Sequence, residues 1–261
     1  GTAMELILAT YALWRRDITR FLRQRSRIVG ALGTPVVFWI LLGSGLDSSF
    51  SVGSLGVPTG GYLEYFYPGT LALILLFTAI FSTISVIEDR HEGFLQGVMV
   101  APAPRVAIAL GKILGGTTLA LLQAVLFLIL APLANAKIDL AVLPLLLTVL
   151  AVFAFALTGL GFVLAWILDS TQGFHAIMNL LLFPMWLLSG AVFPPDGAAG
   201  WIQVAMLVNP MTYGVEALRT ILSATNTSGG PASISDPLAF ITLFGLITLA
   251  LSSWSVTYRR T

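Results

Sequence analysis

The sequence predicts an all-α integral membrane protein with six transmembrane helices. Its composition is 57% hydrophobic and only 10% charged, with a mean hydropathy of +0.94. A soluble domain carries about 25% charged residues. The apolar residues also form runs long enough to cross a bilayer, and the basic residues gather on one side of those runs.

Six uncharged runs come close to or exceed the roughly 20 residues that a helix needs to cross the hydrocarbon core. They cover residues 28–46, 69–87, 113–134, 140–168, 173–193 and 238–256. We expect helices, because lipid offers no hydrogen-bond partner to an unpaired backbone group. The run over 140–168 is longer than a perpendicular span requires, so we expect it to tilt or to extend beyond the membrane.

The basic residues predict the orientation. With both termini placed in the cytosol, eleven Lys and Arg residues lie inside, and only Lys137 and Arg219 lie outside. This asymmetry follows the positive-inside rule. The loop over 88–105 is then cytosolic, and the segment over 190–237 is external.

Residues 4–27 have the pattern of an amphipathic helix that precedes the first span. At about 100° per residue, one face is apolar and the other basic. The apolar face carries Tyr11, Trp14, Ile18, Phe21 and Leu22, and the basic face carries Arg16, Arg20, Arg23 and Arg27. We expect an interface helix with its arginines toward anionic lipid headgroups. It either only anchors the chain or also contacts a cytosolic partner.

The loop over 88–105 concentrates charge in a chain that has little of it. It holds Glu88, Asp89, Arg90, Glu92 and Arg105, out of 13 basic and 12 acidic residues in all. A turn between two spans needs only a few polar residues. The loop is therefore predicted to be a charged cytosolic helix that contacts another molecule.

The external segment over 190–237 is unusually apolar. Gly190, Pro194 and Pro195 should end the helix of the fifth span. Residues 201–208 are apolar but too short to cross a membrane, which favours a re-entrant or interfacial helix. Asn209 and Pro210 predict a turn, and Tyr213 follows it. Glu216 and Arg219 lie one helical turn apart, so they are able to pair with each other.

Several kinds of chemistry are absent from the sequence. It has no phosphate-loop motif, so we expect no ATP binding by this chain alone. It has no metalloprotease or serine-hydrolase motif and no cysteine. His91 and His175 are too far apart to predict a metal site. The spans lack acidic residues, which argues against a proton-driven carrier. The net charge of +1 gives no reason to expect a nucleic-acid partner.

From Met4 onward, the chain resembles the membrane subunit of an ABC-2 type (type V) ABC exporter. Members typically carry Glu-x-x-x-Glu-Gly-Thr-Leu-Glu after the second span, then Thr-Pro and a basic residue. The matching residues here are Glu88, Glu92, Gly93, Leu95, Pro102 and Arg105, whereas Phe94, Gly97 and Ala101 depart from the pattern. The external matches are Ser189, Gly190, Phe193, Pro194, Asn209, Pro210, Tyr213, Glu216 and Arg219.

The resemblance implies a single transmembrane domain over 4–261 and a separate ABC ATPase subunit that binds ATP and Mg²⁺. Residues 88–100 would be a coupling helix in a groove of that subunit, flanked by the helix over 4–27. The coupling residues would be Glu88, Asp89, Arg90, Glu92, Gly93, Leu95 and Arg105. The resemblance also implies a second copy of the chain and a location in the bacterial cytoplasmic (inner) membrane.

In this family the substrate path lies between the two membrane subunits, along their first, second and fifth spans. The candidate lining residues are Phe38, Trp39, Thr78, Ser82, Ser85, Asn179, Phe183 and Trp186. An aromatic, weakly polar wall suits a drug-like or lipid-like amphipathic substrate. Export of a polysaccharide or lipid-linked glycan, an ATP-independent channel and a membrane scaffold stay open as alternatives.

Overall fold

The computed structural model describes residues 2–47, 61–224 and 234–258. Within these ranges all regular elements are helices. Five of them are long and apolar enough to cross a membrane, and each overlaps a predicted span. They are Arg25–Gly45, Tyr62–His91, Val106–Leu128, Leu143–Ile167 and Ser235–Tyr258. The described residues thus confirm an all-α membrane protein. Arg259 and Arg260, which were counted on the cytosolic side, lie outside the described residues.

The described helices lie in the following order along the chain. The first half of the chain contains α1 (Thr2–Arg23), α2 (Arg25–Ile28), the π-helix η1 (Val29–Gly33), α3 (Thr34–Gly45), α4 (Tyr62–His91), α5 (Phe94–Val100) and α6 (Val106–Leu128). The second half contains η2 (Ala131–Ala134), α7 (Leu143–Ile167), α8 (Thr171–Ile177), the π-helix η3 (Met178–Leu182), α9 (Phe183–Leu187), α10 (Gly200–Val208), α11 (Pro210–Ala224) and α12 (Ser235–Tyr258).

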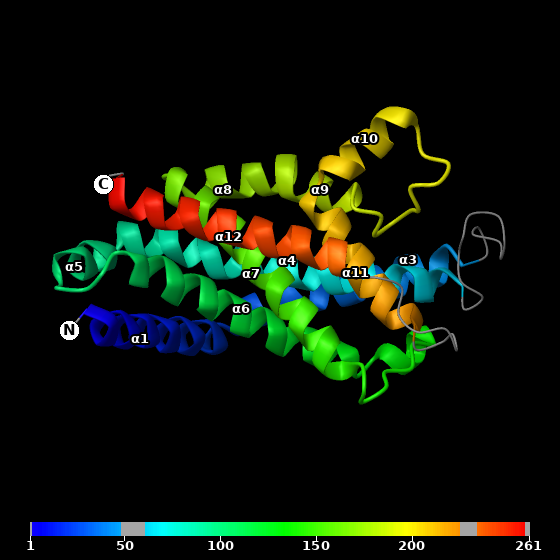
Figure 1. The fold of residues 1–261 in the computed structure, drawn as a ribbon, viewed down its shortest axis with the longest axis horizontal. Coiled ribbons are helices and arrows are strands. Elements are labelled where there is room, and N and C mark those ends of the chain that lie inside the picture. Colours follow the sequence, from blue (N-terminus) through cyan, green and yellow to red (C-terminus); the bar gives the residue numbers. More distant parts are fainter. Residues whose placement is uncertain (1, 48–60, 225–233, 259–261) are drawn as a thin grey trace.

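The long helices form a bundle around α4. This helix packs against α3, α6 and α7 and is buried along most of its length. α5, the start of α1 and the end of α12 lie at one end of the bundle, and α3 and α11 extend to the other (Figure 1). We call the first the α5 end. The predicted cytosolic loop and both ends of the described chain therefore share one end of the molecule.

The predicted fifth span, 173–193, differs from the other five. Its helical backbone runs through α8, η3 and α9 and ends at Leu187, before the positive φ of Gly190. It is shorter than the five long helices. Both π-helices lie just before a proline in the sequence, Pro35 for η1 and Pro184 for η3. Proline lacks an N–H, which favours such local departures from the regular hydrogen-bond pattern.

α1 packs along α6, burying Leu13 and Phe21. Gly111 allows the close approach, because a Cβ there would lie 2.7 Å from the Cβ of Leu13. The indole N–H of Trp14 donates to the Thr118 hydroxyl at 3.0 Å. Tyr11 and Leu22, also predicted on the apolar face, are exposed.

The single helix predicted over 88–100 is wrong in its boundaries. α4 continues to His91, and the chain turns at Gly93, whose φ of +76° is left-handed. Glycine adopts this conformation without the Cβ penalty that other residues pay. The charged residues Glu88, Asp89 and Arg90 consequently belong to the end of α4, whereas α5 carries no charge.

Candidate functional site

An ionic cluster joins four helices near the α5 end. It comprises Arg16, Asp17, Arg20, Arg27, Glu88, Asp89 and Lys112. Asp89 is fully buried at its centre. Arg16 donates to both Asp89 carboxylate oxygens, at 2.9 and 2.8 Å, and Arg20 donates to one at 2.6 Å. The Lys112 ammonium also contacts Asp89. Burial of a charge is costly unless it is paired, so this arrangement fixes α1, α4 and α6 relative to one another.

Lys112 and Asp17 form the buried floor of the ionic cluster. Lys112 is 3% exposed and donates to Asp17 at 3.0 Å and to the Ser85 hydroxyl at 3.3 Å. Burial raises the pKa of the Asp17 carboxyl, and the Lys112 ammonium opposes that rise. Lys112 is the one charged residue of the apolar helix α6, and Asp17 supplies part of the countercharge that it needs.

Glu88 extends the ionic cluster to the start of the first long apolar helix. It accepts from Arg20 at 2.9 Å and from Arg27 at 2.5 Å. Arg27 also donates to the carbonyl of Phe81 at 3.2 Å. Glu92 is 60% exposed and lies 3.5 Å from Arg20. Glu92 therefore marks the water-facing edge of the ionic cluster.

α5 rests directly on this cluster. Leu95 is buried in the core, and the Arg16 guanidinium lies 3.6 Å from the centroid of the Phe94 ring. Gln96, Gly97 and Val100 face outward. A force applied to the outer face of α5 would therefore reach α1 and α4 through Phe94 and Arg16.

A second set of contacts joins α4 to the connection between α7 and α8. Arg90 donates to the carbonyls of Trp166 at 2.8 Å and Leu168 at 3.2 Å, which caps the end of α7. Its guanidinium lies 5.1 Å from the Trp166 ring and 3.3 Å from Asp169. His91 contacts the Asp169 carbonyl at 2.7 Å. The Arg90 side chain is thus directed into the protein, where it is only 13% exposed.

The predicted coupling residues do gather at one end, but they do not form a common exposed surface. Asp89 and Leu95 are buried, and Glu88 and Arg90 pair within the chain. Glu92 and Arg105 are exposed, and Arg105 donates to the Thr257 carbonyl at 2.8 Å. The expectation that the arginine face of α1 points to lipid is also wrong for Arg16, Arg20 and Arg27, which bind acids of α4. Arg23 is exposed.

Sequence analysis missed Asp17 and Lys112. The predicted third span began at residue 113, so Lys112 was assigned to the loop before it. The available signal was the lone charge of Lys112 on the apolar helix α6, since such a charge needs a partner.

Half of the eight predicted path residues are buried within the chain. Trp39 and Trp186 are buried, and their indole N–H groups donate to the carbonyls of Leu63 at 3.0 Å and Gly69 at 2.8 Å. Thr78 is buried and donates to the Ile74 carbonyl. These three residues do not face a path between two chains in this structure.

Other predicted path residues occupy different surroundings. Asn179 and Phe183 line a cavity of about 130 Å³ beside α4. Ser82 donates to the Ala79 carbonyl, and Ser85 contacts Lys112 in the ionic cluster. Phe38 is 40% exposed on α3. Asn179 and Phe183 thus lie together at this cavity, and their part in a substrate path stays a prediction.

In the predicted external segment, α10 and α11 meet at a turn that is anchored to α9. The Asn209 amide donates to the carbonyls of Met185 and Leu188, and its oxygen accepts from the Met211 N–H. Pro210 is the first residue of α11. Tyr213 stacks on Phe240 with ring centroids 4.0 Å apart. Residues 225–233 of this segment lie outside the described residues.

Arg219 binds backbone and not Glu216. It donates to the carbonyls of Tyr65 at 3.1 Å and Gly190 at 3.0 Å, and lies 4.2 Å from the Tyr65 ring centroid. Burial lowers the pKa of the Arg219 guanidinium. Glu216 is exposed, whereas Pro194, after the Gly190 turn, is half-buried. Arg219 thus holds the Gly190 turn against α4.

A multi-pass bundle of apolar helices, with its charges tied together beneath a short helix at one end, identifies the class of the chain as a multi-pass membrane protein. Residues 9–223 match the family model for the ABC-2 type transporter, and the chain belongs to this family as a permease subunit.

Known relatives agree with this assignment at low identity. The chain is 25% identical over 256 residues to the putative transport permease ycf38 of Porphyra purpurea, covering 95% of this chain and 85% of the relative. It is 27% identical over 236 residues to nodulation protein J of Rhizobium leguminosarum bv. viciae, covering 89% and 85%. It is 22% identical over 215 residues to the daunorubicin resistance ABC transporter permease protein DrrB1 of Streptomyces coeruleorubidus, covering 82% and 74%.

Proposed function

We propose that this chain is the transmembrane subunit of an ATP-driven ABC exporter. It moves an amphipathic drug-like or lipid-like substrate out of the cytosol or the inner leaflet. A separate ABC ATPase subunit binds ATP and Mg²⁺ and supplies the energy. Membership of the ABC-2 type transporter family supports this division of labour, and the relative named for daunorubicin resistance favours a drug-like substrate.

The ionic cluster beneath α5 is the observation that carries the proposal. Closure of two ATPase subunits around ATP is a rigid-body motion, and a rigid contact is needed to pass it to the spans. α5 offers an exposed, uncharged outer face, while Leu95 and Phe94 connect its inner face to the core and to Arg16. We assign the ATPase contact to Gln96, Gly97 and Val100, with Glu92 and Arg105 at its edges.

The ionic cluster and Arg90 then distribute the motion. The cluster makes α1, α4 and α6 move as a unit, because separating them would leave Asp89 and Lys112 buried without their partners. Arg90 carries the same motion to the end of α7 and the start of α8. A push on α5 thereby reaches the helices on both sides of α4.

The full topology is part of the proposal. In Figure 1, α8, η3 and α9 extend along the bundle from the α5 end toward the opposite end, which supports a sixth crossing. Six crossings put both termini on the cytosolic side of a bacterial inner membrane. The positive-inside count supports this orientation.

A second copy of the chain completes the substrate path in the proposal. α3 exposes Val37, Phe38, Ile40 and Leu41, and η3 exposes Leu180 and Leu181. These apolar faces suit a neighbouring permease and an amphipathic substrate held between the two copies. Polysaccharide or lipid-linked glycan export uses the same architecture, and an aromatic wall also suits sugar faces.

Charge reversal at the edge of the proposed contact tests it. Glu92→Arg is expected to leave the chain folded while reducing both recovery of the ATPase subunit in a pull-down and ATP-driven transport after reconstitution. Asp139→Arg is the matched control, because it makes the same change at an exposed acid outside the proposed contact. Equal ATPase recovery and transport for both variants and the wild type would remove the assignment of the contact.

A further inference from the structure

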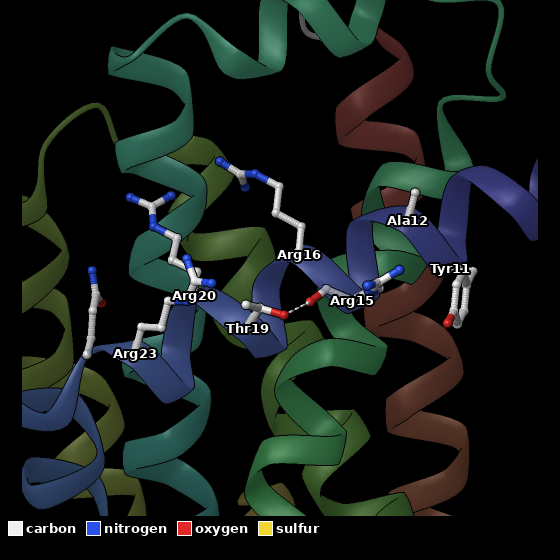
Figure 2. A pocket seen from close by; sticks show the side chains of 8 residues that line it. Tyr11, Ala12, Arg15, Arg16, Thr19, Arg20 and Arg23 are labelled. Carbon is white, nitrogen blue, oxygen red and sulfur yellow. Dashed lines mark hydrogen bonds between the residues drawn. The ribbon is translucent and has the colours of Figure 1, made fainter.

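Two of the grooves on the surface of the described residues lie toward opposite ends of the bundle. One of about 760 Å³ runs along the outer face of α1, where Figure 2 shows Arg15, Arg20 and Arg23. The contacts expected for this interface helix account for it. The other groove, of about 470 Å³, lies where α6 is followed by η2 and the segment before α7, at the end away from α5 (Figure 1). No expected contact accounts for this second groove, which we call the η2 groove.

The η2 groove offers hydrogen-bond donors to a ligand. Lys137 lines it, is exposed and forms no ion pair within the described residues. Lys137 and Ile138 lie in an irregular stretch, and neither backbone N–H donates to an acceptor in the parts of the chain that the structure describes. Asp139 follows, but its Oδ1 accepts from the Ala141 N–H at 3.2 Å, just before α7. An ammonium group beside free backbone N–H groups favours an anion.

An apolar stripe on α6 leads from the η2 groove toward the middle of the bundle. Leu122, Leu126 and Ile129 share one face of the helix and are 46%, 45% and 71% exposed, and Ile129 also lines the groove. α6 begins at the α5 end, so the lower-numbered residues of the stripe lie nearer the middle of the bundle. Figure 1 shows α6 on the opposite side of the bundle from α8 and α9. The stripe is therefore not the η3 face that we assign to the second copy.

We propose that the η2 groove binds the phosphate of a phospholipid from the leaflet at the end away from α5. Lys137 pairs with the phosphate, and the acyl chains lie along the α6 stripe. The direction fits, because the stripe lies nearer the centre of the bilayer than Lys137 does. A soluble phosphate ester or an acidic peptide would use the donors but not the stripe. This site is separate from the exported substrate, goes beyond the proposed function and does not depend on which end of the bundle is cytosolic.

Lys137 is its own reporter for this proposal. The chain has two lysines, and Lys112 is 3% exposed and ion-paired, so an amine-acetylating reagent should modify Lys137 far faster. The full-length chain in mild detergent is acetylated with phosphatidylglycerol, with diacylglycerol of the same acyl chains or with glycerol phosphate, and peptide mass spectrometry gives the rate at Lys137. Phosphatidylglycerol should lower that rate by roughly tenfold, the size of one charge-assisted hydrogen bond, because the bound phosphate pairs with the ammonium and covers it. Diacylglycerol lacks the phosphate and glycerol phosphate lacks the acyl chains, so neither should protect Lys137.

A pair of variants tests the acyl-chain contact. Ile129→Asn in the stripe should lose most of the protection by phosphatidylglycerol, whereas Leu243→Asn, at a 58% exposed position on α12, should be protected like the wild type. Melting temperatures check that both variants remain folded, and the wild-type comparison needs no variant.

Equal acetylation rates of wild-type Lys137 with and without phosphatidylglycerol overturn the proposal. Protection by glycerol phosphate at equal concentration assigns the η2 groove to a free phosphate ester and also overturns it. So does equal protection of the two folded variants, which would show that the α6 stripe does not hold the lipid.

Discussion

Replacing Asp89 with Asn should destabilise the chain strongly, although the two side chains have nearly the same shape. Asp89 is fully buried and pairs with Arg16, Arg20 and Lys112. Breaking a buried ion pair by removing one partner costs about 3–5 kcal/mol. Arg16 and Arg20 are 31% and 21% exposed and recover some hydration, whereas buried Lys112 keeps Asp17 and the Ser85 hydroxyl as partners. We therefore expect the free energy of unfolding to fall by an amount near the lower end of that range, about 3 kcal/mol.

Denaturant unfolding in detergent, followed by tryptophan fluorescence, measures this loss. The chain has 6 tryptophans, and Trp39, Trp166 and Trp186 are buried reporters of the core. Glu92→Gln is the matched control, because Glu92 is 60% exposed and makes one contact at 3.5 Å. That control should lose less than about 1 kcal/mol. Equal unfolding free energies for the two variants would refute the view that Asp89 fastens α1 to α4.

A double-mutant cycle sharpens the test. Asp89→Asn/Lys112→Met removes both buried partners, so it should cost less than the sum of the two single changes. Neighbouring charges couple by about 0.5–3 kcal/mol. Simple additivity would show that the contact between Asp89 and Lys112 contributes nothing of its own.

Two further variants test the turn before α5 and the contact between α4 and the end of α7. Gly93→Ala places a Cβ in the left-handed turn before α5, where it would meet no atom within 4 Å. The cost should therefore be the backbone strain alone, about 1–2 kcal/mol in unfolding free energy. Gly97→Ala is the control: its Cβ also meets no atom within 4 Å, but Gly97 lies within helix α5, so the variant should not lose stability. Arg90→Gln removes the cap on α7, where a hydrogen bond to a charged group contributes about 1.5–3 kcal/mol, so amide hydrogen exchange at residues 168–171 should rise. Unchanged exchange there would show that Arg90 does not hold this connection.

The long apolar helices could be read from the sequence because hydrophobic length alone determines which segments can cross a membrane. The helix of the fifth predicted span was harder to delimit from the sequence, since it is interrupted by η3 just before Pro184 and ends before Gly190. The start of α5 is also determined by a single glycine, Gly93. Nothing in composition reveals that Gly93 adopts a positive φ and separates the charged end of α4 from an uncharged α5.

The ionic cluster was the least predictable feature. Lys112 and Asp17 are 95 residues apart in the chain and meet only because α1 packs along α6. The surroundings of the predicted path residues were also difficult to predict from the sequence. An aromatic residue such as Trp39 or Trp186 suits the protein core as well as a substrate path, because both environments are apolar. The structure places these two in the core, where each indole N–H has a carbonyl partner.

Proteoliposomes that hold this chain and its ATPase subunit test the central claim most directly. ATP hydrolysis and movement of daunorubicin or a fluorescent phospholipid are measured in the same vesicles. The account predicts that the reporter moves only when ATP is hydrolysed and that Asp89→Asn, under conditions where it stays folded, reduces transport per ATP consumed. Movement at the same rate without ATP, or ATP hydrolysis that is indifferent to this chain, would contradict an ATP-driven permease.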